Sequence, residues 1–144
     1  MQKTIQLSLF SPIAQLAGLD TAIKGAMAAA ADESKMSRAQ GCDKMNELAA
    51  AAGIRLCANA KSLSLPLFEK WLNPADREHI PSLKAVQVFC CVYHTATPWG
   101  AILQAFGVHA LGPEEMRFYY IGKAQHEFEQ AKDTLKKAKA RAKQ

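Results

Sequence analysis

Four cysteines and four histidines are the side chains of this chain best suited to metal binding or nucleophilic chemistry. No two cysteines have the Cys-x-x-Cys spacing, and the histidines lack the paired spacing of a zinc site. We therefore expect no metal site, and free, buried thiols of the kind found in a reducing compartment. The residues in question are Cys42, Cys57, Cys90, Cys91, His79, His94, His109 and His126.

The nearest approach to a catalytic pair is His94, which follows Cys90 by four residues in what we expect to be one helix. The surrounding residues are apolar, which favours a half-buried structural histidine over a general base. The sequence also lacks recognisably spaced paired carboxylates and glycine-rich phosphate loops. We therefore predict that the chain is not an enzyme, and we expect neither a cofactor nor a small-molecule substrate.

Positive charge gathers in two places of a chain whose formal net charge is +5. The segment from Lys35 to Arg77 holds seven basic and four acidic residues, and the tail from Lys132 to Gln144 holds six basic residues against one acid. Basic segments of this kind bind nucleic acid by displacing counterions from phosphates, although a lysine-rich helix end can also simply be solvated.

Membrane association is not expected from this sequence. The longest apolar stretches, such as those starting at Ala26 and Ala85, are shorter than the roughly 20 residues that cross a bilayer. The first ten residues alternate apolar and polar side chains and lack the basic-then-apolar order of a signal peptide. We expect a cytoplasmic protein.

The elements that must position these charges are all predicted to be helical. A length of 144 residues suits one core with appendages, and caps, prolines and apolar spacing mark six helices. The first runs from about Pro12 to Ala31, or begins instead at Asp20 or Thr21. The others start at Ser37, Ser64, Pro81, Thr97 and Pro113, with core faces that include Cys42, Met45, Leu48 and Ala49; Leu67, Phe68, Trp71 and Leu72; and Leu83, Val86, Phe89, Cys90 and Tyr93.

The last predicted helix carries an apolar row with alternating spacings of three and four residues, as in the seam of a coiled coil. Ile121, Phe128 and Leu135 are its large members, and we expect them to mediate dimerisation. The alternative is that the first half of the helix packs on its own domain while the lysine-rich end is solvated. The full row is Ile121, Ala124, Phe128, Ala131, Leu135, Ala138 and Ala142.

Five aromatic residues near this helix are expected to be core. Their helical spacing favours packing over ligand stacking, and they would dock the long helix onto the fifth one. They are Trp99, Phe106, Phe118, Tyr119 and Tyr120.

The segment LSLPLFEKWLNPADREHIPSLKAVQVFCCV, from Leu63 to Val92, resembles the third and fourth helices of the lambda-repressor-like helix-turn-helix family. The likeness lies in a short helix ending in Trp71, Leu72 and Asn73, followed by a loop to Pro81 and an apolar helix. With Ser37, Arg38 and Gln40 ahead of it, the region is similar to small regulatory proteins of Mu-like and other temperate phages. The connection from Gly53 to Ser64 is longer than the family's tight turn.

The resemblance implies a short helix that enters the major groove of double-stranded DNA, and candidate residues for contacting it. One group lies on the short helix and in the segment just before it. The other group lies on the preceding helix and in the loop that follows, and it would hold the DNA backbone. The candidates are Lys61, Ser62, Ser64 and Lys70 in the first group and Arg38, Gln40, Lys44 and Arg77 in the second. Glu69, within the reading helix, argues against a phosphate-facing surface there.

We therefore predict an all-α, prophage-type transcriptional regulator, dimeric and DNA-binding, with a compact helical bundle containing a helix-turn-helix-like unit. Residues 1–111 would form the helix-turn-helix-like domain, and residues 112–144 the long C-terminal helix that joins two copies. The alternative is a non-catalytic interaction or assembly module, whose basic tail only aids solubility or binds nucleic acid without specificity.

Overall fold

The computed structural model describes residues 16–142, and the predicted N-terminal start at Pro12 lies outside them. The predicted all-α class is confirmed, because 68% of the described residues are helical and they contain no strand. The helices divide between two compact units, one ending at His109 and the other beginning at Ala110. None of the helices in residues 16–142 is both long enough and apolar enough to cross a membrane.

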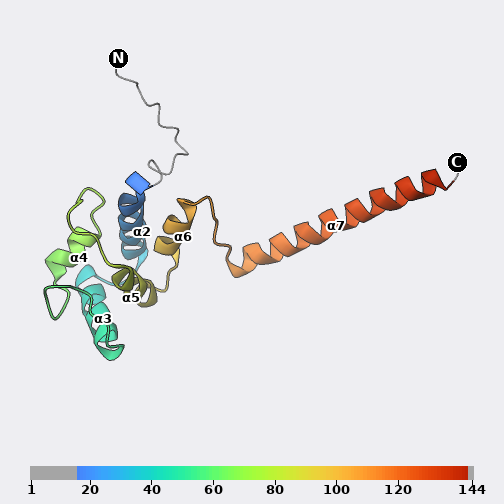
Figure 1. Cartoon of the computed structure of the whole chain (residues 1–144). Coiled ribbons are helices and arrows are strands. Elements are labelled where there is room, and N and C mark those ends of the chain that lie inside the picture. The colour runs from blue at the N-terminus through green and yellow to red at the C-terminus, as the bar shows by residue number, and fades with distance from the viewer. Residues whose placement is uncertain (1–15, 143–144) are drawn as a thin grey trace, which may run out of the picture. The chain divides into compact units, whose positions relative to one another are not determined.

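In the described part of the first unit the elements run from α2 to α6 (Figure 1). They are α2 (Leu19–Glu33), α3 (Arg38–Ala51), α4 (Leu65–Trp71), α5 (Leu83–Tyr93) and α6 (Thr97–Gln104). Helix α2 packs chiefly on α6, and α3 packs on α5 and α4. A turn at Gly18 interrupts the helix, and α2 begins at Leu19, one residue before the alternative start at Asp20.

Serine caps set the starts of three of these helices. The Ser37 hydroxyl accepts from the Gln40 N–H at 3.2 Å, and the Gln40 Oε1 accepts from the Ser37 N–H at 3.0 Å, which completes a capping box. Ser64 and Ser82 accept from the N–H groups three residues later. Helix α5 therefore starts at Leu83, two residues after the predicted Pro81.

The core of the first unit lies where α2 to α5 meet. Met27, Met45, Phe68, Val86 and Phe89 are fully buried or nearly so. The ring of Phe89 lies 6.3 Å from that of Phe68, centroid to centroid, and the Tyr93 ring stacks on it at 4.3 Å. These contacts tie the short helix α4 to α5 in one apolar cluster.

Gly41 is required by the close approach of α5 to α3. A Cβ atom placed there would lie 1.9 Å from the Tyr93 hydroxyl oxygen, so any other residue would force the ring to move. That hydroxyl is buried and has no hydrogen-bond partner among the described residues. Burial raises the pKa of the Tyr93 phenol.

Several predicted core positions are in fact exposed. Leu48 is exposed at the edge of the buried stripe of α3, Leu83 is exposed as the first residue of α5, and Cys91 is exposed beside buried Cys90. His94 is exposed as well, since it ends α5 in the left-handed conformation, with φ 50°. The predictions of burial at these four positions are wrong.

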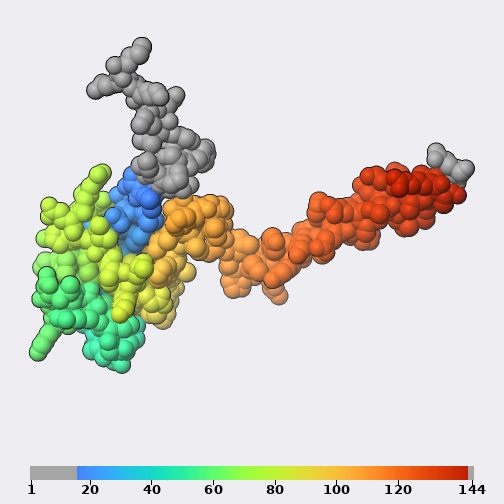
Figure 2. All heavy atoms as spheres, in the orientation of Figure 1, coloured from blue at the N-terminus to red at the C-terminus, as the bar shows by residue number. Residues whose placement is uncertain are grey.

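The second unit contains the long helix α7 (Pro113–Arg141), as predicted. The Glu115 carboxylate accepts from the Gly112 N–H at 2.8 Å. Glu114 and Glu115 in the first turn, and Lys139 and Arg141 in the last, complement the helix dipole. Figure 2 shows its side chains surrounding a single helix, and none of the residues of α7 is buried.

Four of the five aromatic residues of the predicted cluster are not buried within their own unit. Phe106 in the first unit is exposed, and so are Phe118, Tyr119 and Tyr120 on α7. Only Trp99 is half-buried against the core. The rings of Tyr119 and Tyr120 meet edge to face, with centroids 5.7 Å apart. Docking of α7 onto α6 stays a prediction.

Candidate nucleic-acid interface

Helix α4 turns one face into the core and leaves the other open. Phe68 and Trp71 are buried, whereas Leu65, Glu69 and Lys70 are exposed. At about 1.5 Å per residue, its seven residues span about 10 Å. A helix this short has little stability of its own, so its position depends on what holds it.

The start of α4 is held by Asn46 on α3. The Asn46 amide nitrogen donates to the Leu63 carbonyl at 2.8 Å, and its Oδ1 accepts from the Leu63 N–H at 2.7 Å. The Cys42 thiol lies 3.4 Å from the same carbonyl oxygen. Leu63 is buried and directly precedes the Ser64 cap. The long connection from α3 is therefore fixed at the point where α4 begins.

The end of α4 is held by Lys24 on α2. This lysine is 1% exposed, and its ammonium donates to the Lys70 carbonyl at 3.1 Å and to the Asp76 carbonyl. The Asp76 carboxylate lies 3.6 Å from the ammonium. A buried cation thus meets one carbonyl oxygen in the last turn of α4, where the helix dipole is negative, and a second in the loop that follows.

Asp76 organises the loop after α4. Its Oδ1 accepts from the His79 N–H at 2.9 Å and the Glu78 N–H at 3.0 Å, and its carboxylate contacts the His79 ring. These hydrogen bonds, that from the His79 backbone first, hold the pKa of the Asp76 carboxyl well below its usual range. The His79 Nε2 lies 3.4 Å from the Lys70 ammonium, so the loop also restrains Lys70.

Two of the candidates on α3 already have structural partners. The Arg38 guanidinium donates to Asp32 at 3.0 Å on the surface, and Gln40 uses its amide oxygen in the capping box. The Gln40 amide N–H groups remain available to a ligand. Lys44 is exposed, and because it precedes Asn46 by two helical positions it lies on nearly the opposite side of α3.

The candidates around α4 occupy its two ends. Lys61 and Ser62 are exposed in the loop before it, and Ser64 caps it. Lys70 lies in its last turn. Arg77 lies instead beside the start of α2, lining a small hollow with Asp20 and Asp76. The eight candidates therefore do not form one cluster.

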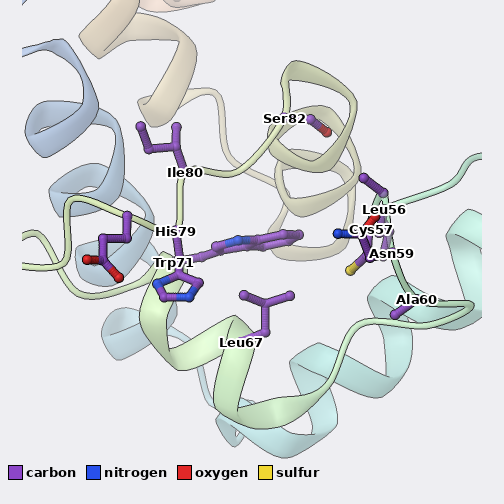
Figure 3. Close-up of a pocket in the computed structure, with 11 residues that line it drawn as sticks. Leu56, Cys57, Asn59, Ala60, Leu67, Trp71, His79, Ile80 and Ser82 are labelled. Atoms are coloured by element: carbon purple, nitrogen blue, oxygen red, sulfur yellow. The ribbon is translucent and has the colours of Figure 1, made fainter.

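A cavity of about 370 Å³ lies on the inner side of α4. Figure 3 shows the Trp71 indole across its middle with Leu67 beside it, the His79 ring at one side, and Cys57 and Asn59 at the other. The lining is mainly apolar, and it places Trp71 between the loop before α4 and the loop after it. Trp71 is the anchor that the sequence predicted for the short helix.

The thiols and histidines do not gather into a reactive centre in the described part of the chain. Burial raises the pKa of Cys42, Cys57 and Cys90, so these thiols stay protonated near neutral pH and are weak nucleophiles. Within residues 16–142, no group of three His, Cys, Asp or Glu side chains is arranged to hold a metal ion.

Sequence reasoning missed Lys24 and Asn46, the two residues that hold α4. Lys24 shares its helical face with Met27 and Ala31, and a lysine on an apolar stripe is a detectable sign of a buried cation. Asn46 lies four positions after the core residue Cys42 and directly after the core residue Met45. A polar side chain beside the buried face of a helix is a detectable sign of a structural hydrogen bond.

Comparisons of this chain with family models, curated proteins and solved structures found no match.

Proposed function

We propose that this chain binds double-stranded DNA through α3, the following loop and α4, and that it regulates transcription in the manner of prophage regulators, as a dimer joined through α7. The observation that carries the proposal is the fastening of α4 at both ends, by Asn46 and by Lys24. A recognition helix must keep a fixed position relative to its supporting helix, because base contacts depend on geometry.

The charge along the approach to α4 supports the same role. Residues 48–68 contain no acidic residue, and their two cations, Arg55 and Lys61, are both exposed. In the view of Figure 2, α3 (turquoise) and the loop after it (green) adjoin on the surface. Phosphates could therefore approach without meeting a carboxylate in this stretch of chain.

Within this proposal the residues divide by task. Lys61 and Ser62 would contact phosphates beside the start of α4, and Lys70 would do so at its end. Arg38 and the Gln40 amide would hold the backbone from the start of α3, whereas Lys44 and Arg77 lie away from α4 and are not part of the proposed surface. Glu69, at the centre of the open face, could accept a hydrogen bond from the amino group of cytosine, so its charge fits a base contact better than a phosphate contact.

The test is selection of bound duplexes from a random pool, followed by fluorescence anisotropy over a range of salt concentrations. The Lys61→Ala/Lys70→Ala variant should lose at least tenfold in affinity for a selected sequence, because both cations flank the reading helix. Lys35→Ala/Lys123→Ala removes the same charge from exposed positions elsewhere and should lose much less. Equal losses in both variants, or no enrichment of any sequence, would contradict specific recognition through α4.

The second candidate is an interaction or assembly module that does not read DNA. The exposed apolar row of α7 favours it, because such a row needs a partner whether or not DNA is bound. Absence of any salt-sensitive DNA complex, together with stable self-association, would favour this role.

A further inference from the structure

The longest uncovered apolar surface in the described chain runs along α7. Ile121, Phe128 and Leu135 are 56%, 67% and 55% exposed. Alanines at 124, 131 and 138 separate them in the alternating three-and-four spacing, so all six lie along one face of the helix. Large and small side chains alternate along this row from Ile121 to Ala138.

We propose that α7 pairs in the antiparallel direction with α7 of a second copy, with Phe128 of one copy opposite Ala131 of the other. The proposal deepens the dimer of the proposed function by giving its direction and register. It does not depend on DNA binding.

The alternation of sizes decides between the two directions. In an antiparallel pair of this register, Ile121 faces Ala138 and Leu135 faces Ala124 of the other copy, so every layer combines one large and one small side chain. A parallel pair would place Phe128 against itself and Ala131 against itself, and crowded layers would alternate with empty ones. Close packing favours layers of equal volume.

The distribution of charge along α7 favours the same direction. Residues 113–129 contain four acidic and two basic side chains, whereas residues 130–141 contain five basic side chains and Asp133. An antiparallel pair sets each acidic half beside a basic half, and it also opposes the two helix dipoles. A parallel pair would bring the two basic ends together, and they would repel each other.

Side chains flanking the row are compatible with this register. Tyr120 would lie beside Arg141 of the other copy, and Phe118 beside Lys139, which are cation–π combinations. Gln125 would lie beside Lys132. A parallel pair would gain Glu127 beside Lys132, but an exposed ion pair of that kind adds little.

Disulfide cross-linking of the full-length chain distinguishes the directions. Ile121→Cys and Ala138→Cys chains are prepared separately, each with Cys91→Ser because Cys91 is exposed. We expect little covalent dimer from either chain alone, since the two copies of residue 121 would be about 26 Å apart and a disulfide needs Cα atoms within about 7 Å. A mixture of the two chains should give a covalent heterodimer.

Efficient cross-linking of each chain with itself would show a parallel pair and overturn the proposal. No cross-link in the mixture would also overturn it, whether the chain is monomeric or pairs through another face. All of these measurements are made without DNA. A negative result would therefore overturn the proposed pairing without bearing on DNA binding.

Sedimentation of two charge variants provides the second test. Phe128→Lys places a charge in the centre of the row and should weaken the dimer at least tenfold. Gln130→Lys adds the same side chain on the outer face of the exposed helix and should leave the dimer nearly unchanged. Equal effects of the two substitutions would show that the row does not form the dimer.

Discussion

Single polar residues determine where helix α4 lies. Lys24 is buried beneath the end of α4, and its ammonium donates to two backbone carbonyls, one in the last turn of the helix and one in the loop that follows. Lysine is rarely buried so completely unless every one of its interactions is favourable. Its position couples α2 to both α4 and the loop after α4.

Lys24→Met should therefore lower the free energy of unfolding by about 1–3 kcal/mol, because it keeps the volume but leaves the Lys70 and Asp76 carbonyls without their donor. Urea denaturation followed by circular dichroism measures the change. Lys35→Met, at an exposed position, should change stability by less than about 0.5 kcal/mol. An unchanged free energy of unfolding in Lys24→Met would mean that water replaces the ammonium at no cost.

Residue patterns predicted caps and apolar anchors well, and predicted buried polar residues poorly. Ser37 and Ser64 cap helices and Phe68 and Trp71 anchor α4 as predicted, whereas the cap of α5 is Ser82 and not the predicted start at Pro81. These roles depend on neighbours in sequence, which a periodic pattern records. Lys24 finds its partners 46 and 52 residues away, and no local pattern records such a distance. The predicted burial of Leu83 and Cys91 is wrong for a related reason, since the exact limits of a buried stripe depend on what packs against it.

At the level of whole elements, the connection between α3 and α4 is the feature on which the interface depends. It is longer than a helix-turn-helix turn, yet its last residue is held by the double hydrogen bond from Asn46 to Leu63. The side chain replaces a tight turn as the means of fixing the angle between two helices. A turn of standard length is therefore not required to fix the angle between α3 and α4.

Asn46→Ala should destabilise the fold by about 1–3 kcal/mol, because two backbone groups of buried Leu63 lose their partner. It should also lower DNA affinity under conditions where the protein remains folded, since the start of α4 would no longer be fixed. Asn59→Ala, at an exposed position in the same loop, is the matched control. Thermal melting and anisotropy separate the two effects, and an unchanged affinity would show that Asn46 serves stability alone.

Helix order and approximate limits followed from the sequence, including α7. The role of the aromatic residues of α7 could not be predicted from the sequence. Spacing alone does not distinguish a helix face that packs on its own chain from one that is free to bind a partner. Phe118, Tyr119 and Tyr120 are exposed, and the same spacing would describe them had they been buried.

Considered as a whole, the molecule combines a compact helical unit with a separate helix that carries its own surface. The basic end of α7 would add salt-dependent, sequence-independent attraction to DNA. Lys136 and Lys137 are exposed and lie off the apolar row, so their charge can be removed without altering the proposed pairing.

Lys136→Gln/Lys137→Gln should reduce the slope of log affinity against log salt by up to about 1.8, at about 0.9 for each phosphate that a lysine no longer neutralises. The preference for a selected sequence over random DNA should not change. Anisotropy titrations at several salt concentrations measure both quantities, with Lys123→Gln as the control from the acidic half of the helix. If the slope is unaltered, the basic end does not touch DNA.

The hydrogen bonds of Asn46 also have an evolutionary consequence. Ala58 to Ser62 are exposed between buried Cys57 and buried Leu63, so both ends of this short segment are anchored independently of its length. The entropy of closing a loop grows only with the logarithm of its length, about 0.6 kcal/mol for each doubling. Insertions here would alter the surface that precedes α4 while the core stays the same, so this segment can change in length and composition at little cost to folding.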